Sequence, residues 1–540
     1  MTSINMRNSF DFIIVGGGSA GCVLANRLSA CGRFHVALIE AGPAATSPFS
    51  TMPGGVARFM HSRRFNWLNR SSDAAPLRAG KGLYAPRGKG LGGSSAINAM
   101  IYTRGLPSDY NRWAETAGEH WNWEHVLPVF KRLESNTRGA NAYHGADGPL
   151  HVSDVAPHFA VAKAFLQAAQ EAGYPLNPDF NGESLEGFGP FQFTIKNGER
   201  FSAKRAFLEP VIDRVNLHIL SATAVEKILF NSSGEAQGVQ IRHGKLVSSL
   251  TASREVLLSA GAFNSPQLLL LSGIGPREQL RSHGIEVIAD RQEVGANLQE
   301  HVDITVHVRN KKRDTISLNP LGLLQLAGQT WKYWRHRKGA MAHPPCEVGG
   351  FIKSNDQQAE PDLQLHLVST LFNDSGYDLT PALRYGFSCH VCVLRPQARG
   401  TLTLASSDPR QPPRIQFNFL DNEADQQALI AGVRQVQQIM QQPALASHYG
   451  GELMPGQFDD DEELLAQLQR HCGLIYHPTS TCRMGLDADA VVDEKLRVRG
   501  VHNLRVIDAS VMPQVISGNT NAPTMMIAEQ AADFILADYS

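Results

Sequence analysis

The chain lacks the features that place a protein in a membrane, in an oxidising compartment or on a nucleic acid. No apolar run approaches the roughly 20 residues that a membrane-spanning helix requires. The seven cysteines are scattered and odd in number, which argues against a disulfide framework. The first ten residues have neither the apolar core nor the small-residue cleavage site of a signal peptide. With 50 basic and 51 acidic side chains, no global basic field attracts nucleic acid.

These absences predict a cytoplasmic protein that binds no nucleic acid, and they leave peripheral contact with the inner membrane open. The chain has 540 residues, of which 42% are hydrophobic and 19% charged. That length and composition are typical of a globular protein of two domains or of one large elaborated unit. The 48 glycines exceed average usage, and many of them cluster in short loops, as nucleotide-binding proteins require.

The N-terminal segment predicts a strand, a turn, a helix and a second strand. Residues 11–15 form an apolar run typical of a buried strand, and residues 22–29 predict a helix. A second strand is expected over residues 34–39, and it ends at Glu40. An acid at this position can accept hydrogen bonds from a ribose diol. The order of elements is that of a dinucleotide-binding unit.

The turn itself contains Gly16, Gly18 and Gly21. In such a unit the first glycine allows the tight turn, the second lets the backbone approach a pyrophosphate, and the third lets the helix pack on the strand. Gly17, Ser19 and Gly21 also match the nucleophile elbow of α/β-hydrolases. That elbow follows several strands of its sheet, whereas Ser19 follows only one predicted strand. We therefore favour the dinucleotide site.

A second glycine-rich stretch spans residues 87–98. The consecutive Gly92 and Gly93 leave the backbone bare where a flat ring or a phosphate must come close. Ser94 and Asn98 add short hydrogen-bonding side chains. Apolar residues around Asn98 favour a buried segment over a flexible surface loop.

Elements of this kind recur across the chain, at residues 11–40, 87–105, 254–275 and 504–530. An NAD-binding domain is usually one contiguous block. A cofactor held by distant segments is more typical of FAD.

A single histidine near the C-terminus is the best candidate for a catalytic base. His477 follows an apolar run and lies between Tyr476 and Pro478, and Asn521 follows 44 residues later. Imidazole is the side chain best suited to take a proton at neutral pH. A core histidine satisfied by its neighbours is the alternative, and the nucleotide-type segments favour catalysis.

Four features, taken in order, resemble one known family. They are the N-terminal glycine pattern, residues 88–98, residues 261–275, and the pair His477 and Asn521. On these features the sequence resembles the glucose-methanol-choline (GMC) oxidoreductases over nearly its whole length. Within that family it is most similar to the bacterial FAD-dependent alcohol dehydrogenases of alkane utilisation, with choline dehydrogenase somewhat further off.

The resemblance implies an α/β fold (α+β overall) with two interleaved domains. A Rossmann-like FAD-binding domain is expected over residues 1–158, 200–305 and 470–540. A substrate-binding domain built on an antiparallel sheet is expected over residues 159–199 and 306–469.

The resemblance also implies the chemistry. His477 is expected to take the hydroxyl proton of a primary alcohol while hydride passes to flavin N5, with Asn521 holding the hydroxyl oxygen. The electrons are expected to pass to a quinone-type acceptor. Three alternatives stay open: an alcohol oxidase that uses O₂, a choline dehydrogenase, and, from a different class, a nucleotide-binding protein without catalysis.

The resemblance assigns further residues to the cofactor. Val225 is expected to bind adenine through its backbone, and Asp508 and Ala509 to lie near the pyrophosphate and the ribityl chain. Some relatives attach the flavin covalently through a histidine where this chain has Ile97, so non-covalent FAD is expected here. The cofactor set is Gly16, Gly18, Ser19, Ala20, Gly21, Glu40, Ala41, Trp67, Arg87, Gly92, Gly93, Ser94, Asn98, Ala99, Met100, Val225, Ala260, Asp508, Ala509, Pro523 and Thr524.

A metal site competes for the same region. His471, Cys472, His477 and Cys482 could be taken for a Cys₂His₂ zinc set, but structural zinc usually takes paired ligands two to four residues apart. Cys389 and Cys392 lie in a predicted strand, where residues three apart point to opposite faces. We therefore expect no metal.

The middle of the chain changes to alternating strands, for example residues 362–368 and 400–404, which suit a sheet with one solvated or cavity-facing side. Tyr476 and Glu347 are candidate substrate residues. Residues 342–346 supply no aromatic cage for a quaternary ammonium, which favours an uncharged, apolar alcohol. We expect residues 297–301 to form a turn or a short helical piece, with His301 in a structural role.

A helix is predicted over residues 320–338. Pro320, Leu323, Leu324, Ala327, Trp331 and Trp334 fall on one face, and four basic residues crowd its end. Two interpretations stay open. The helix is either a surface helix packed on the substrate domain, or an interfacial helix that docks on an anionic membrane and admits apolar substrate and quinone.

Overall fold

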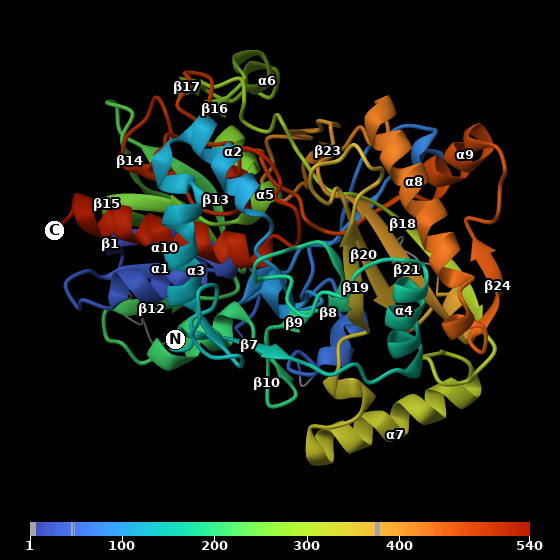
Figure 1. Ribbon diagram of the computed structural model, residues 1–540. Helices are drawn as coiled ribbons and strands as arrows, with labels where there is room; N and C mark the ends of the chain where they lie inside the picture. The colour runs from blue at the N-terminus through green and yellow to red at the C-terminus, as the bar shows by residue number, and fades with distance from the viewer. Residues whose placement is uncertain (1–6, 45–46, 48, 373–378) are drawn as a thin grey trace.

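The computed structural model describes residues 7–44, 47, 49–372 and 379–540. Two seven-stranded sheets organise it, and Figure 1 shows them in two halves that lie side by side. The first sheet has the order β12-β2-β1-β15-β14-β13, and β26 also pairs with β15. Its strands are β1 (Ser9–Val15), β2 (Val36–Ile39), β12 (Leu217–Leu220), β13 (Thr223–Phe230), β14 (Ala236–His243), β15 (Leu246–Leu258) and β26 (Leu504–Val506).

The centre of the first sheet is parallel and buried. β1 pairs in parallel with β2 and β15, and its residues Phe12, Ile13 and Ile14 are fully buried. A strand covered on both faces needs such a continuous apolar run. β13 and β14 extend the sheet in antiparallel fashion. The Rossmann-like expectation for this half and the α/β class are confirmed.

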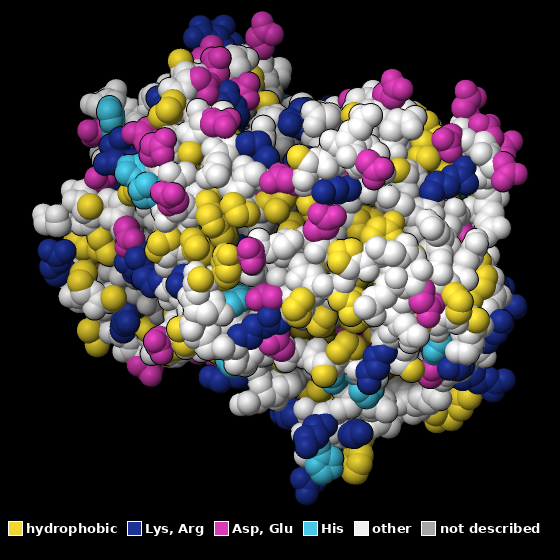
Figure 2. All heavy atoms as spheres, viewed as in Figure 1, with side chains coloured by type: hydrophobic (Ala, Val, Ile, Leu, Met, Phe, Trp, Pro, Cys, Tyr) yellow, Lys and Arg dark blue, Asp and Glu magenta, His cyan; other side chains and the backbone are white. Residues whose placement is uncertain are grey.

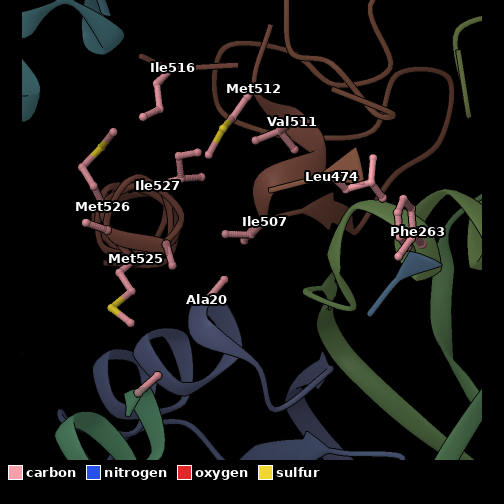
Figure 3. Close-up of a cluster of buried hydrophobic side chains, with 14 of the residues drawn as sticks. Ala20, Phe263, Leu474, Ile507, Val511, Met512, Ile516, Met525, Met526 and Ile527 are labelled. Atoms are coloured by element: carbon pink, nitrogen blue, oxygen red, sulfur yellow. The ribbon is translucent and has the colours of Figure 1, made fainter. Parts of the chain in front are cut away.

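Two helices from opposite ends of the chain pack together beside this sheet. They are α1 (Ser19–Ser29) and α10 (Asn521–Asp538), and Arg27 of α1 forms ion pairs with Glu529 and Asp533 of α10. Figure 3 shows how the segment before α10 joins this core. Its labelled side chains Ile507, Val511 and Met512 lie on the side of α10 that carries Ile527, whereas Met525 and Met526 project from the other side of that helix; all belong to one hydrophobic core that also contains Ile516 and Ala20 of α1.

The second sheet is antiparallel, with the order β24-β18-β21-β20-β19-β8, and β25 also pairs with β18. Its strands are β8 (Gly187–Pro190), β18 (Val302–Asn310), β19 (Cys346–Ile352), β20 (Leu363–Val368), β21 (Gly386–Val393), β24 (Tyr449–Met454) and β25 (Gly473–Leu474). Helix α8 (Glu423–Met440) covers one face so closely that a Cβ on Gly432 would lie 2.6 Å from Val391 Cγ1.

The alternation along β20 does not reflect a solvent-exposed face. Leu363, Leu365 and Leu367 are buried, and Leu363 approaches α8. His366 and Val368 face the other way and line a cavity, yet they too are buried. The polar positions of the pattern therefore mark a cavity wall.

The remaining elements connect these halves. The other α-helices are α2 (Pro107–Ala117), α3 (Trp123–Leu133), α4 (Ala160–Glu171), α5 (Gly261–Leu271), α6 (Arg277–Ser282), α7 (Pro320–His336) and α9 (Asp461–His471). The short strands are β3 (Asn69–Arg70), β4 (Tyr84–Ala85), β5 (Ile101–Tyr102), β6 (Glu134–Asn136), β7 (Leu150–Asp154), β9 (Gln192–Phe193), β10 (Ile195–Lys196), β11 (Glu199–Arg200), β16 (Ile274–Gly275), β17 (Ala289–Asp290), β22 (Thr401–Thr403) and β23 (Arg414–Gln416).

Of the turn or short helical piece predicted over residues 297–301, the structure shows only a bend at Asn297, whose φ is +55°. Leu298 and Gln299 form isolated β-bridges instead of a helix, and Gln299 pairs in antiparallel fashion with Thr479. This bridge lays the segment beside the loop that carries His477. A pairing between residues so distant in sequence produces no local sequence pattern from which it could be predicted.

Helix α7 presents its apolar stripe to the outside. The face that packs on the protein contains Gly322, Leu326 and Tyr333, whereas Leu324, Trp331 and Trp334 are 71%, 67% and 53% exposed. In Figure 1 the helix runs along the lower edge of the molecule, and Figure 2 shows apolar and basic side chains together there. Among the described residues, no helix combines the length and the apolar character needed to cross a bilayer.

Candidate active site

A cavity of about 810 Å³ lies between the two sheets. This is near the upper end of the ~300–1,000 Å³ range of ligand pockets. One wall comes from the ends of β1 and β2 and the start of α1, and the other carries His366 of β20 and His390 of β21.

The first glycine-rich turn is packed as the sequence predicts. A Cβ on Gly16 would lie 2.4 Å from the Ser259 carbonyl oxygen, and one on Gly21 would lie 1.9 Å from the Gly16 oxygen. Gly16 has a φ of +105°, which an L side chain rarely adopts. Helix α1 begins directly after Gly18, and Ser19 lines the cavity. The unpaired amides of this helix end favour an anion such as a pyrophosphate.

The second glycine-rich stretch lies directly on the first. The Gly92 amide donates to the Gly17 carbonyl at 2.7 Å, and a Cβ on Gly93 would lie only 2.6 Å from Gly18 Cα. Two bare backbones therefore meet at the cavity wall, where side chains would fill the space. This cradle and the adjacent helix end fit a flat, phosphate-bearing cofactor.

Glu40 joins these loops. Its carboxylate accepts hydrogen bonds from the amides of Gly17 at 2.8 Å, Gly42 at 2.7 Å and Gly90 at 2.8 Å. It also lines the cavity. A carboxylate has about four lone-pair sites, so one stays open to a ribose hydroxyl.

Most of the residues assigned to the cofactor line this cavity, and three do not. Gly21, Gly92 and Pro523 lie outside the lining. Gly21 has no room for a Cβ beside the Gly16 oxygen, and Gly92 has a φ of +97°, which an L side chain rarely adopts. The assigned residues in the lining are Gly16, Gly18, Ser19, Ala20, Glu40, Ala41, Trp67, Arg87, Gly93, Ser94, Asn98, Ala99, Met100, Val225, Ala260, Asp508, Ala509 and Thr524.

His477 is 7% exposed and reaches the cavity with its ring. Its Nε2 lies 3.0 Å from Asn519 Nδ2, and its Nδ1 lies 3.1 Å from His301 Nδ1. Burial holds the pKa of His477 well below its ordinary value, and His301, His366 and Arg87 lower the pKa further. The imidazole is therefore neutral at physiological pH.

The structure places Asn519 in contact with His477, while Asn521 lines the same cavity without touching the imidazole through a hydrogen bond. Asn521 is the first residue of α10, and its Oδ1 accepts a hydrogen bond from Ser19 at 2.7 Å. Asn519, two residues earlier, lies against His477. The segment offers two asparagines in the same stretch, and only the position at which the helix begins decides which one reaches the imidazole.

Two further neighbours of His477 were missed. Glu300 Oε1 accepts the backbone amide of His477 at 2.6 Å, and His301 meets its ring. Burial raises the pKa of Glu300 to about 8, against the opposing charge of Arg87. The assignment of His301 to a purely structural role did not anticipate this contact, because it depends on the bridge between Gln299 and Thr479.

Glu347 is not a cavity residue, contrary to the expectation. Its carboxylate accepts the backbone amides of His158 at 2.8 Å and Phe159 at 3.1 Å, at the start of helix α4. An anion at a helix N-terminus satisfies amides that lack helical partners. Tyr476, the other candidate, lines the cavity, and Arg87 donates to its carbonyl oxygen at 2.6 Å.

The end of the cavity away from the glycine-rich turns is mostly apolar, and we call it the substrate end because of the role proposed below. The described acids in the lining are Glu40, Glu226 and Asp508, all at the nucleotide end. Over the described part of the chain, no group of three or more His, Cys, Asp or Glu side chains is arranged to hold a metal ion. The apolar lining residues at the substrate end are Ile316, Leu318, Leu326, Met341, Val368, Leu371, Phe372, Leu379 and Ala382.

Sequence models of one family match most of the chain. The GMC oxidoreductase models cover residues 10–303 and residues 396–528. An alcohol dehydrogenase [acceptor] of Pseudomonas putida is 44% identical over 535 residues, which cover 98% of this chain and 96% of that protein. The mitochondrial choline dehydrogenase of Homo sapiens is 41% identical, with 98% of this chain and 90% of that protein covered.

Solved structures agree with this assignment. A pyridoxine 4-oxidase from Mesorbium loti superposes with a TM-score of 0.88 at 29% identity and covers 98% of this chain and 99% of its own. A variant formate oxidase of Aspergillus oryzae, studied for FAD modification, superposes with a TM-score of 0.90 at 26% identity, with 99% of each chain covered.

The fold and the glycine cradle define an FAD-binding oxidoreductase. The chain belongs to the GMC oxidoreductase family, and it is an FAD-dependent alcohol dehydrogenase of that family. The predicted family, enzyme class and cofactor are confirmed.

The cradle can be tested at its closest point. In Gly93→Ala the new Cβ has no room beside Gly18 Cα, and the φ of +51° at this position adds strain, so we expect purified protein with little bound FAD. The ratio of visible flavin absorbance to protein absorbance measures this. Gly328→Ala is the control, since nothing lies within 4 Å of a Cβ there. Full flavin content in Gly93→Ala contradicts the assignment of the cradle.

Proposed function

We propose that this enzyme oxidises a primary, apolar alcohol to the aldehyde, with His477 as the base that takes the hydroxyl proton. Bound FAD supplies the hydride acceptor. The observation that carries the proposal is the neutral, buried His477 imidazole at the cavity wall, 3.0 Å from the Asn519 amide. Ile97 lines the same cavity with an aliphatic side chain, which supports non-covalent FAD.

Removal of the proton is the task of His477. An alcohol hydroxyl is too weakly acidic to ionise unaided, whereas an alkoxide expels hydride readily from its carbon. The neutral imidazole takes the proton as the C–H bond breaks, and such general-base help contributes roughly 10²–10⁴-fold. The imidazolium then stabilises the oxygen from which the proton came.

Asn519 supplies a neutral donor beside the base. Its Oδ1 accepts from Gln364 Nε2 at 3.2 Å and from Thr103 Oγ1 at 3.3 Å, which directs Nδ2 toward His477. A substrate hydroxyl that enters between them donates to His477 Nε2 and accepts from Asn519 Nδ2. The amide orients the oxygen without adding charge that lowers the basicity of His477. This role passes from Asn521 to Asn519.

The charge of the cavity favours an uncharged substrate. Glu347 is engaged with the start of helix α4, and the described acids of the lining lie at the nucleotide end. Trp67, an aromatic residue of the lining, already stacks against the Lys89 ammonium at 4.5 Å. Besides Trp67 the described lining contains the aromatic residues Tyr476 and Phe372, but no carboxylate at its apolar end that could balance the charge of a quaternary ammonium.

The role of His477 has a direct test. His477→Ala should retain FAD while flavin reduction by alcohol, followed anaerobically by stopped flow, slows by roughly 10²–10⁴-fold. Because burial lowers the pKa of His477, the wild-type rate should stay level as the pH falls from neutrality to 6.5 and decline only in more acid solution. His448→Ala, a buried histidine outside the cavity lining, should leave the rate unchanged. Near-wild-type reduction by His477→Ala would falsify the role.

One panel of assays identifies both the preferred class of alcohol and the preferred electron acceptor. 1-Octanol, benzyl alcohol and choline are each offered with a short-chain quinone analogue and, separately, with O₂ alone. We expect the two uncharged alcohols to be oxidised faster than choline, and the quinone to accept electrons faster than O₂. If choline is the best substrate, or if O₂ matches the quinone, the choline dehydrogenase or the oxidase interpretation replaces ours.

We further propose that the outer face of α7 docks on an anionic membrane, from which quinone and apolar substrate enter. We call this surface the α7 face; it consists of Leu321, Leu323, Leu324, Trp331 and Trp334, joined by the exposed Leu379 and Leu383 of the neighbouring segment. Leu318 of the loop before α7 donates its amide to the Ala382 carbonyl, which holds the two segments together.

The charges around the α7 face support a membrane over another protein surface. Residues 320–339 contain no acid, and Lys332, Arg335 and Lys338 are exposed at the end of the helix. Basic and tryptophan side chains together favour the interface of an anionic bilayer. Leu326, on the opposite side of α7, lines the cavity, so an apolar molecule leaving the bilayer has a short path inward.

Vesicle sedimentation tests this surface. Wild type should bind vesicles of phosphatidylglycerol better than vesicles of phosphatidylcholine, and Trp331→Ser/Trp334→Ser should weaken that binding by about tenfold or more. Val215→Ser/Leu246→Ser, at side chains 91% and 75% exposed elsewhere, should bind as wild type does. No binding by wild type, or a smaller oligomer in the tryptophan variant than in wild type on size-exclusion chromatography, contradicts the membrane proposal.

A further inference from the structure

We propose that His301 is a positioning residue that fixes the tautomer of His477, so that the Nε2 lone pair of His477 faces the substrate. This inference rests on the proposed role of His477 as the base. His301 does not line the cavity and is fully buried, so it acts only through its neighbour.

The segment that carries His301 is fixed to the loop of His477 at three points. The backbones of Gln299 and Thr479 exchange hydrogen bonds of 3.2 and 2.9 Å. Glu300 Oε1 accepts the amides of both His301 and His477, at 3.0 and 2.6 Å. The two imidazoles then meet edge to face with ring centroids 5.2 Å apart. Their contact is thus set by the backbone around them.

The positions of the protons follow from the donors and acceptors around the two rings. His301 Nε2 lies 3.1 Å from the Ile516 carbonyl oxygen, which can only accept, so this nitrogen carries a hydrogen; the Leu394 carbonyl is a second backbone acceptor beside the ring. Burial lowers the pKa of His301 to about 4, so the ring is neutral and its Nδ1 has a lone pair. His477 Nδ1, 3.1 Å away, must therefore donate. The neutral His477 ring is left with its lone pair on Nε2.

The other side of His477 gives the same answer independently. Asn519 Oδ1 is occupied by donors from Gln364 and Thr103, so its Nδ2 donates toward His477. That N–H needs a lone pair on Nε2. Two chains of hydrogen bonds, from Ile516 and from Thr103, therefore converge on one tautomer.

The same contact serves the charged state. When His477 takes a proton at Nε2, its Nδ1–H becomes the donor of a charge-assisted hydrogen bond to His301. His301 accepts it as a neutral group and adds no repulsion. The other titratable groups that act on the pair are Glu300, Arg87 and His366. Of these, Glu300 accepts backbone amides and leaves the imidazole contact to His301.

Two substitutions at His301 separate this role from packing. His301→Phe fills the space but cannot accept, so flavin reduction by alcohol should slow by about tenfold to 100-fold. The acid limb of its pH profile should move to lower pH, because the imidazolium loses its acceptor. In His301→Gln the amide oxygen can accept from His477 Nδ1 and the amide nitrogen can donate to Ile516. This variant should retain most of the rate.

Anaerobic stopped-flow reduction across pH is measured for both variants, with FAD content checked first and His301→Leu as the substitute if His301→Phe does not fold. Slow reduction in the variant without an acceptor, together with rescue in His301→Gln, supports the proposal. Equal slowing in both variants assigns His301 to packing and overturns it, as does wild-type behaviour in His301→Phe. If His477→Ala itself reduces normally, the proposed function fails instead, so the two failures are distinguishable.

Discussion

Burial keeps the His477 imidazole neutral, and the rest of the site depends on that condition. Removing the ring from water disfavours its charged form, and a histidine without compensating hydrogen bonds would be a costly group to bury. The structure meets this cost with polar partners on each side: Asn519 at Nε2, His301 at Nδ1 and Glu300 at the backbone amide. The same set of contacts therefore buries the imidazole of His477 and fixes its orientation.

The two halves of the protein supply different parts of this arrangement. The parallel sheet and its helix end bring two glycine-rich backbones together, and only a residue without a side chain allows that approach. The antiparallel sheet supplies the opposite wall, where His366 and Val368 of β20 face inward while the alternate leucines pack on the other side. The parallel sheet buries continuous apolar runs, and the antiparallel sheet buries the alternate apolar residues of its strands. The cavity lies between these two sheets.

Helix α7 differs from most surface helices in the direction that its apolar side chains face. A helix of a globular protein normally turns its apolar stripe inward. Here Gly322, Leu326 and Tyr333 make the inward contact, and Leu324, Trp331 and Trp334 face outward. Exposed apolar side chains in one patch mark an interaction surface or an aggregation hazard. The basic residues at the end of the helix favour an anionic membrane as the partner over another protein surface. The surface lies on the same helix that lines the cavity from its other side.

The sequence by itself predicted the nucleotide-binding turn, the strands, the family and the candidate histidine, because each leaves a local pattern: glycine spacing, apolar runs, alternation, or an imidazole between Tyr476 and Pro478. Tertiary structure decided which asparagine faces that imidazole, that Glu347 belongs to a helix end, and that His301 touches His477. These facts depend on where α10 begins and on a bridge between Gln299 and Thr479. Contacts between groups so far apart in sequence carry no periodicity, so only the folded chain reveals them.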